Sequence, residues 1–141
     1  MFKKIIALIM SIALLLCLAG CGKKTEENKA EEYKSVITDL LDALAIGDYD
    51  KVESLLYEKS DGEFQKICEK YETDLGFKFA DGYEIRRYMV EDTFDENADK
   101  GKIIYCYDLH VNFGEFKSGI LIDVVDNNGK VGVTSFEVFA R

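Results

Sequence analysis

IIYCYDLHVNF, residues 103–113, is the stretch that decides the fold of this chain. Its odd-numbered positions are all apolar, whereas four of the five even-numbered positions carry Cys, Asp, His or Asn. Successive side chains of a β-strand point to opposite faces, so this alternation indicates one buried face and one wetter face. The stretch therefore predicts a half-buried strand over residues 102–113.

Alternating segments lie on both sides of this strand. Together they predict four strands, at residues 83–94, 102–113, 115–126 and 130–140. Gly114 and the sequence Asn127-Asn128-Gly129 mark tight connections, and Asn-Gly is a strong hairpin signal. Short links between consecutive strands predict an antiparallel meander.

The segment before the strands has helical periodicity instead. Residues 31–46 carry one apolar stripe, and Gly47 follows it as a helix-ending glycine does. A short second helix is expected after Asp50, and Ser60-Asp61-Gly62-Glu63 has the pattern of a capping box that begins a third. We therefore expect an α+β domain in which N-terminal helices cover one face of a curved four-stranded antiparallel sheet.

The beginning of the chain has the composition of an export signal. Lys3 and Lys4 precede the run Ile5–Leu18, which is apolar except for Ser11. At 1.5 Å per residue this run makes roughly 21 Å of helix, short of the about 30 Å of a bilayer core. A basic start, an apolar run of this length and small residues after it favour a cleaved signal over an uncleaved signal anchor, which stays the alternative.

The run ends in Leu18-Ala19-Gly20-Cys21, which resembles the lipobox of bacterial lipoproteins. The resemblance implies that residues 1–20 are removed and that Cys21 is acylated, so that membrane lipid is its first partner. Two acyl chains give stable anchoring where one does not. We expect a lipidated tether at residues 21–30, one domain at residues 31–141, and a location on the outer face of the cytoplasmic membrane.

Composition narrows the function of the mature chain. Loss of the two lysines in residues 1–20 changes the formal charge from −9 to −11, and such an acidic surface disfavours nucleic acid. A single histidine leaves little room for a catalytic triad, and neither a phosphate-binding loop nor a dinucleotide fingerprint is present. We expect no cofactor, no nucleic acid, and a non-enzymatic domain that binds an extracytoplasmic protein or small ligand.

The layout of helices followed by a strand meander resembles the cystatin-like superfamily, in particular the nuclear-transport-factor-two-like cone fold. Its one local motif is Gly47-Asp48-Tyr49-Asp50-Lys51-Val52, which looks like the turn between the first two helices of such domains. Members of this superfamily include isomerases and dehydratases with acids and histidines in a pocket. The alternative function is therefore a small-molecule enzyme of this kind that uses His110 and Asp108, which share one strand face.

Two further patterns give candidate sites. Asp95, Asn97 and Asp99 resemble the front half of a calcium loop, and with Asp92 they are candidate metal ligands, although Lys100 stands where the turn glycine belongs.

The other candidate is a disulfide between Cys68 and Cys106, which an extracytoplasmic location permits. It depends on which face of the strand meets the helices. If the apolar face does, Cys106 points away from Cys68.

Overall fold

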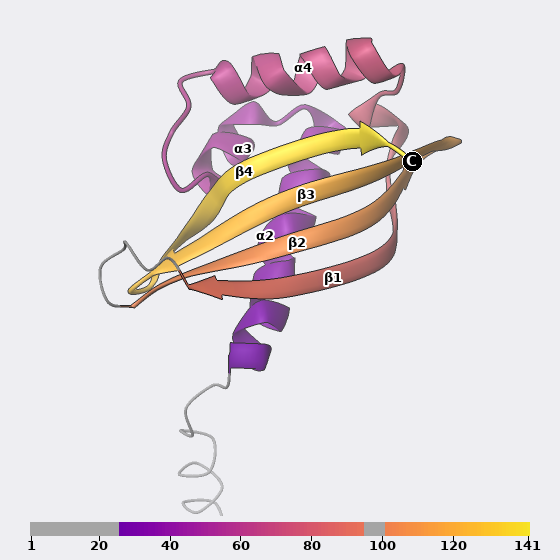
Figure 1. The fold of residues 1–141 in the computed structure, drawn as a ribbon. Coiled ribbons are helices and arrows are strands. Elements are labelled where there is room, and N and C mark those ends of the chain that lie inside the picture. The colour runs from indigo at the N-terminus through magenta and orange to yellow at the C-terminus, as the bar shows by residue number, and fades with distance from the viewer. Residues whose placement is uncertain (1–25, 95–100) are drawn as a thin grey trace, which may run out of the picture.

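The described part of the computed structural model, residues 26–94 and 101–141, contains one four-stranded antiparallel sheet. Its strands lie in the order of the sequence (Figure 1). They are β1 (Glu84–Phe94), β2 (Lys102–Phe113), β3 (Phe116–Asn127) and β4 (Lys130–Ala140). The predicted meander is confirmed, with each strand boundary within one residue of its expected place.

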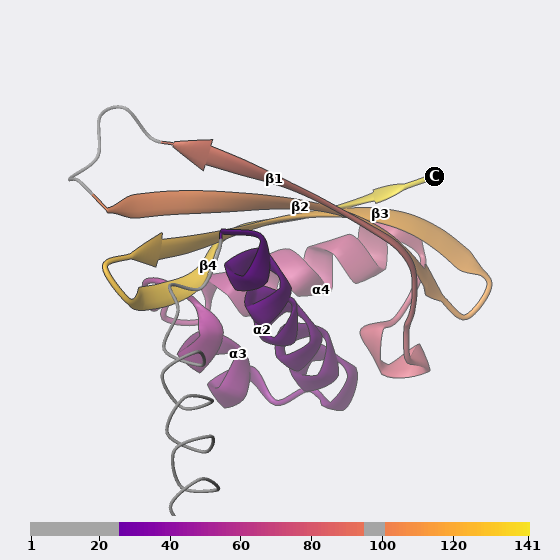
Figure 2. The same cartoon turned by 90° about the horizontal axis from the view of Figure 1, so that it is seen from below.

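Within the described residues, three α-helices precede the sheet and lie on one of its faces (Figure 2). They are α2 (Glu26–Ile46), α3 (Tyr49–Leu55) and α4 (Glu63–Leu75), and a 3-10 turn, η1 (Phe79–Asp81), leads into β1. The α+β class is therefore confirmed. Helix α2 begins inside the segment expected to be a tether, and Ala30 is already buried.

The apolar face of β2 forms the centre of the core. Tyr105, Tyr107 and Leu109 are each at most 1% exposed, and the fully buried Ile37 and Leu40 of α2 belong to the same cluster. Burying an apolar side chain of this size contributes about 1.5–3 kcal/mol, so this face provides much of the driving force for folding. The opposite face of β2 carries the half-buried Cys106, Asp108 and His110.

A buried carboxylate fixes α2 to the sheet. Asp126, near the end of β3, is 6% exposed, and its Oδ2 accepts a hydrogen bond of 2.5 Å from the Tyr33 hydroxyl. Its Oδ1 accepts one of 2.9 Å from the Gly129 amide, and Lys29 Nζ lies 3.9 Å from Oδ2. Burial, and then the bond to Asp126, raises the pKa of Tyr33, which keeps the hydroxyl protonated as a donor.

We expect the Tyr33–Asp126 bond to be measurable in a double-mutant cycle. Asp126→Ala should lower the free energy of unfolding by about 1–3 kcal/mol because it leaves a buried hydroxyl without its acceptor. Tyr33→Phe should cost about 1 kcal/mol, and the double variant should lose less than the sum. Urea unfolding at constant m-value measures each loss. The exposed Asp39→Ala serves as the control, and strictly additive losses would contradict the coupling.

Candidate functional site

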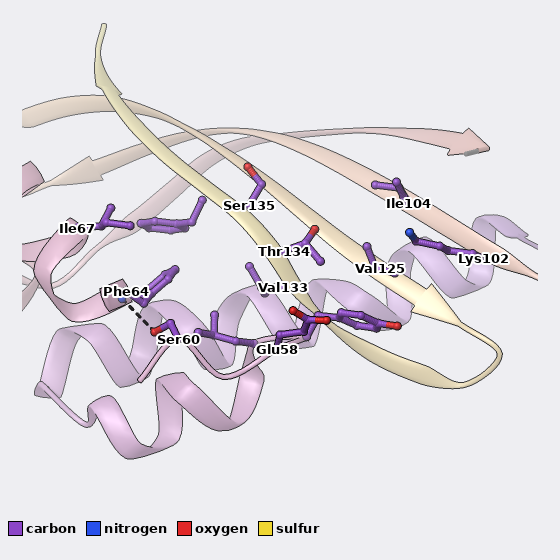
Figure 3. Close-up of a pocket in the computed structure, with 13 residues that line it drawn as sticks. Glu58, Ser60, Phe64, Ile67, Lys102, Ile104, Val125, Val133, Thr134 and Ser135 are labelled. Carbon is purple, nitrogen blue, oxygen red and sulfur yellow. Dashed lines mark hydrogen bonds between the residues drawn. The ribbon is translucent and has the colours of Figure 1, made fainter. Parts of the chain in front are cut away.

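A cleft of about 470 Å³ lies beside β4, between the helices and the sheet. In Figure 3, Phe64 and Ile67 of α4 lie toward one end of it and Lys102 and Ile104 of β2 toward the other. The segment after α3, strand β3 and strand β4 complete the lining with Leu56, Tyr57, Glu58, Ser60, Val125, Val133, Thr134, Ser135 and Phe136. A volume of this size is within the range of small-molecule sites.

The segment after α3 forms one wall of the cleft. It runs beside β4, where Leu56 and Val133 form a parallel bridge and the Tyr57 amide donates to the Val133 carbonyl at 2.8 Å. This approach requires Gly132, because a Cβ there would lie 2.4 Å from the Tyr57 backbone. The Tyr57 hydroxyl accepts a 3.1 Å bond from Asn127 Nδ2.

The loop between α3 and α4 is held by the carboxylate of Glu53. This carboxylate accepts hydrogen bonds from the Ser60 hydroxyl, from the Ser60 amide at 2.8 Å and from the Gly62 amide at 3.4 Å. Its bonds from Ser60 lower the pKa of Glu53. The Ser60 hydroxyl also accepts from the Phe64 amide at 3.0 Å. The predicted capping box is therefore wrong, because the carboxylate that accepts from Ser60 belongs to Glu53 of α3 and not to Glu63.

Helix α4 covers the other part of the β4 edge. The Tyr71 hydroxyl donates to the Phe136 carbonyl at 3.3 Å, and the rings of Phe64 and Phe136 are 5.4 Å apart. The cleft thus lies between two points at which the edge of β4 is covered, Tyr57 on Val133 and Tyr71 on Phe136. Strand residues 133–136 form its floor.

The lining of this cleft is mostly apolar. Seven of its lining side chains are aliphatic or phenylalanine: Leu56, Phe64, Ile67, Ile104, Val125, Val133 and Phe136. The Ser60 hydroxyl donates to the Glu53 carboxylate and accepts from the Phe64 amide, so it holds the local fold. Lys102 and Glu58 add one positive and one negative group, and Tyr57, Ser60, Thr134 and Ser135 add hydroxyls. This composition suits an apolar or amphiphilic ligand.

His110 and Asp108, the candidate catalytic pair, do lie on one face of β2, but it is the face opposite the helices. The Asp108 carboxylate accepts a 3.0 Å hydrogen bond from Arg141 Nη2. Among the described residues no hydrogen bond joins His110 to Asp108. The arrangement gives the imidazole no orienting carboxylate.

A second depression, of about 660 Å³, lies on this outer face of the sheet. Asp108 lines it, and His110 does not. Its apolar members Met89 and Leu121 are 40% and 39% exposed, so the depression is open to solvent. The remaining lining residues are Val90, Glu91, Cys106, Tyr107 and Asp123.

The candidate disulfide is wrong. Cys68 lies in α4, completely buried among core residues, and Cys106 lies on the outer face of β2, so no disulfide joins them. The apolar face of β2 meets the helices, which is the arrangement that turns Cys106 away from Cys68. Burial raises the pKa of the Cys68 thiol to about 12, which makes it an inert core residue.

The remaining candidate residues lie mostly outside the described part of the chain. The residues outside it are Cys21, Asp95, Asn97 and Asp99. The fourth candidate metal ligand, Asp92, is an exposed residue of β1 that stands opposite Tyr105 in the register.

Periodicity did not identify the cleft, although one signal for it was present. A glycine inside a strand marks a place where another backbone comes close, and Gly132 is such a residue. Its neighbour could not be named in advance, because residues 56–60 reach β4 only through the packing of α3 and α4.

Comparison with protein families, with curated proteins and with solved structures finds no match for this chain. In residues 26–94 and 101–141, no helix has both the length and the apolar character needed to cross a bilayer.

We expect Gly132→Ala to lower the free energy of unfolding by about 1–3 kcal/mol, because the new methyl group would collide with the Tyr57 backbone. Gly119→Ala is the matched control. Its methyl group would meet the Phe139 ring and the Arg141 side chain, which can rotate away, so about 1 kcal/mol or less is expected. Thermal and urea unfolding measure both variants. Equal losses would show that residues 56–57 do not lie against β4.

Proposed function

We propose that this chain is a lipoprotein, anchored through acylated Cys21 to the outer face of the cytoplasmic membrane, and that its domain is a non-enzymatic binding domain with the nuclear-transport-factor-two-like cone fold of the cystatin-like superfamily. The ligand is a small apolar or amphiphilic molecule that occupies the β4 cleft. The cleft itself is the observation that carries the binding proposal. An isomerase that uses His110 and Asp108 has less support, because Asp108 is paired with Arg141.

The short distance along the chain from Cys21 to the domain supports anchoring close to the membrane. Helix α2 begins five residues after Cys21, which span at most about 18 Å when fully extended. Near the start of α2, Lys29 lies beside Asp126 at the β3–β4 turn end of the sheet. Lys102 stands opposite Asn127 at the same end, so that part of the cleft lies near the start of α2.

The lining of the cleft supports a ligand rather than a reaction. Apolar side chains from α4 and from three strands surround it, and the hydroxyls of Tyr57 and Ser60 already serve as local hydrogen-bond acceptors. A few polar groups on an apolar lining orient a ligand without transforming it.

Anchoring is tested by replacing the two N-terminal cysteines separately. Cys21→Ala should abolish incorporation of radiolabelled palmitate and stop signal removal, because the acyl acceptor is lost. Cys17→Ala is the matched control, since this cysteine lies within the segment to be removed, and it should be labelled as the unmodified chain is. Intact mass and detergent-phase partitioning measure the products. Normal lipidation of Cys21→Ala would overturn the anchor.

Binding is tested with N-phenyl-1-naphthylamine, a neutral apolar fluorophore, on the domain that begins at Gly22. We expect saturable binding that Ile67→Asp weakens at least about tenfold, because the charge enters an apolar lining. Ile46→Asp is the matched control, since Ile46 is 79% exposed and lies outside the cleft. Absence of saturable binding, or an equal loss in both variants, would contradict the cleft as the site.

A further inference from the structure

The two edge strands of the sheet, β1 and β4, differ in how far other segments cover them. Residues 56–57 and α4 cover the edge of β4, whereas β1 pairs with β2 on one side and with no described strand on the other. Figure 1 shows α4 running alongside β4, whereas α2 only crosses β1 and its first turns project past that strand. An open edge of eleven residues is a template for another strand. Met89 and Val90, near its middle, are 40% and 37% exposed.

The charges of β1 are symmetric about Met89. The strand contains Arg86-Arg87-Tyr88-Met89-Val90-Glu91-Asp92, with two cations before the centre and two anions after it. If two copies of this strand pair antiparallel with Met89 opposite Met89, Arg87 of each copy stands opposite Glu91 of the other. Arg86 then stands opposite Asp92, and Tyr88 opposite Val90. Opposite charges in such cross-strand positions stabilise a sheet.

The faces of β1 agree with this register. Arg87, Met89 and Glu91 stand opposite His110, Asp108 and Cys106 of β2, so all three belong to the outer face. Tyr88 and Val90 stand opposite Leu109 and Tyr107 and belong to the inner face. Each proposed pair therefore joins two residues of the same face. A shift to the next symmetric register would place Arg87 opposite Met89 or Thr93 and would lose its ion pair.

We propose that a second copy of this chain occupies the β1 edge, with the two β1 strands antiparallel about a two-fold axis at Met89. The result is a continuous eight-stranded sheet. Arg87–Glu91, present twice, is the principal ion pair, because Arg86 also contacts Glu84 of its own strand at 2.6 Å and lies at the bulge between Ile85 and Arg87.

The symmetry also agrees with the position of the helices. A two-fold axis perpendicular to the sheet keeps α2 of both copies on the same side of the joined sheet. One membrane surface could therefore hold both chains, although the pairing itself does not depend on the anchor.

Disulfide trapping tests the register in the full chain in its own membrane, in a Cys106→Ser background. Directly opposite residues have Cα atoms about 4.5–5.5 Å apart, within the range that a disulfide bridges. Met89→Cys should therefore give a covalent dimer on oxidation. Leu121→Cys is the matched control, because Leu121 is 39% exposed on the same face but lies in β3, two strands away from the proposed axis. No dimer from Met89→Cys, or equal amounts from both variants, would overturn the register.

Charge reversal tests the ion pair independently. Arg87→Glu and Glu91→Arg, each alone, should raise the dissociation constant of the dimer about tenfold, because two attractive pairs become repulsive. The combined variant Arg87→Glu/Glu91→Arg should restore the original value. Sedimentation equilibrium of the full chain in detergent measures it, with circular dichroism to show that each variant is folded. A chain monomeric at all concentrations, or a combined variant as weak as the single ones, would overturn the proposal.

Discussion

The apolar face of β2 against α2 is the contact on which the arrangement depends. Tyr105, Tyr107 and Leu109 are buried there together with Ile37 and Leu40, and all three α-helices lie on this side. Because the helices lie on one side, the outer face carries polar and half-buried residues instead. The Tyr33–Asp126 bond then fixes where along the sheet α2 lies, since a buried carboxylate needs its donors.

One-sided packing also determines how the two edges differ. The connection from α3 to α4 has to pass beside β4, and there it covers part of the edge and leaves the cleft between Tyr57 and Tyr71. The chain reaches β1 only after η1, at the other side of the sheet, so in residues 26–94 and 101–141 no helix runs along that edge and α2 only crosses it. The cleft and the open edge therefore have a common origin in the path of the chain.

Local pattern was a poor guide to the chemistry of the sites. His110 and Asp108 share a strand face as the alternation predicted, but Arg141, from the end of the chain, takes the carboxylate. Similarly, α3, expected after Asp50, is capped by Asp48, whose side chain accepts from the Lys51 amide at 3.0 Å, and Glu53 rather than Glu63 accepts from Ser60. In the first of these cases the partner is distant in sequence, and spacing alone contains no information about it.

The sequence by itself determined the α+β class, the four strands within one residue at each boundary, the meander order and the face of β2 that is buried. These predictions rest on local properties, namely the two-residue period of strands, the three-to-four-residue period of helices and the turn residues. Local properties can be recognised before the fold is known. Only the tertiary structure decided that α2 begins at Glu26, that Cys68 and Cys106 lie on opposite sides of the sheet, and that a cleft forms beside β4. Those features depend on which segments, far apart in the sequence, come into contact. The packing of the helices on the sheet determines these contacts.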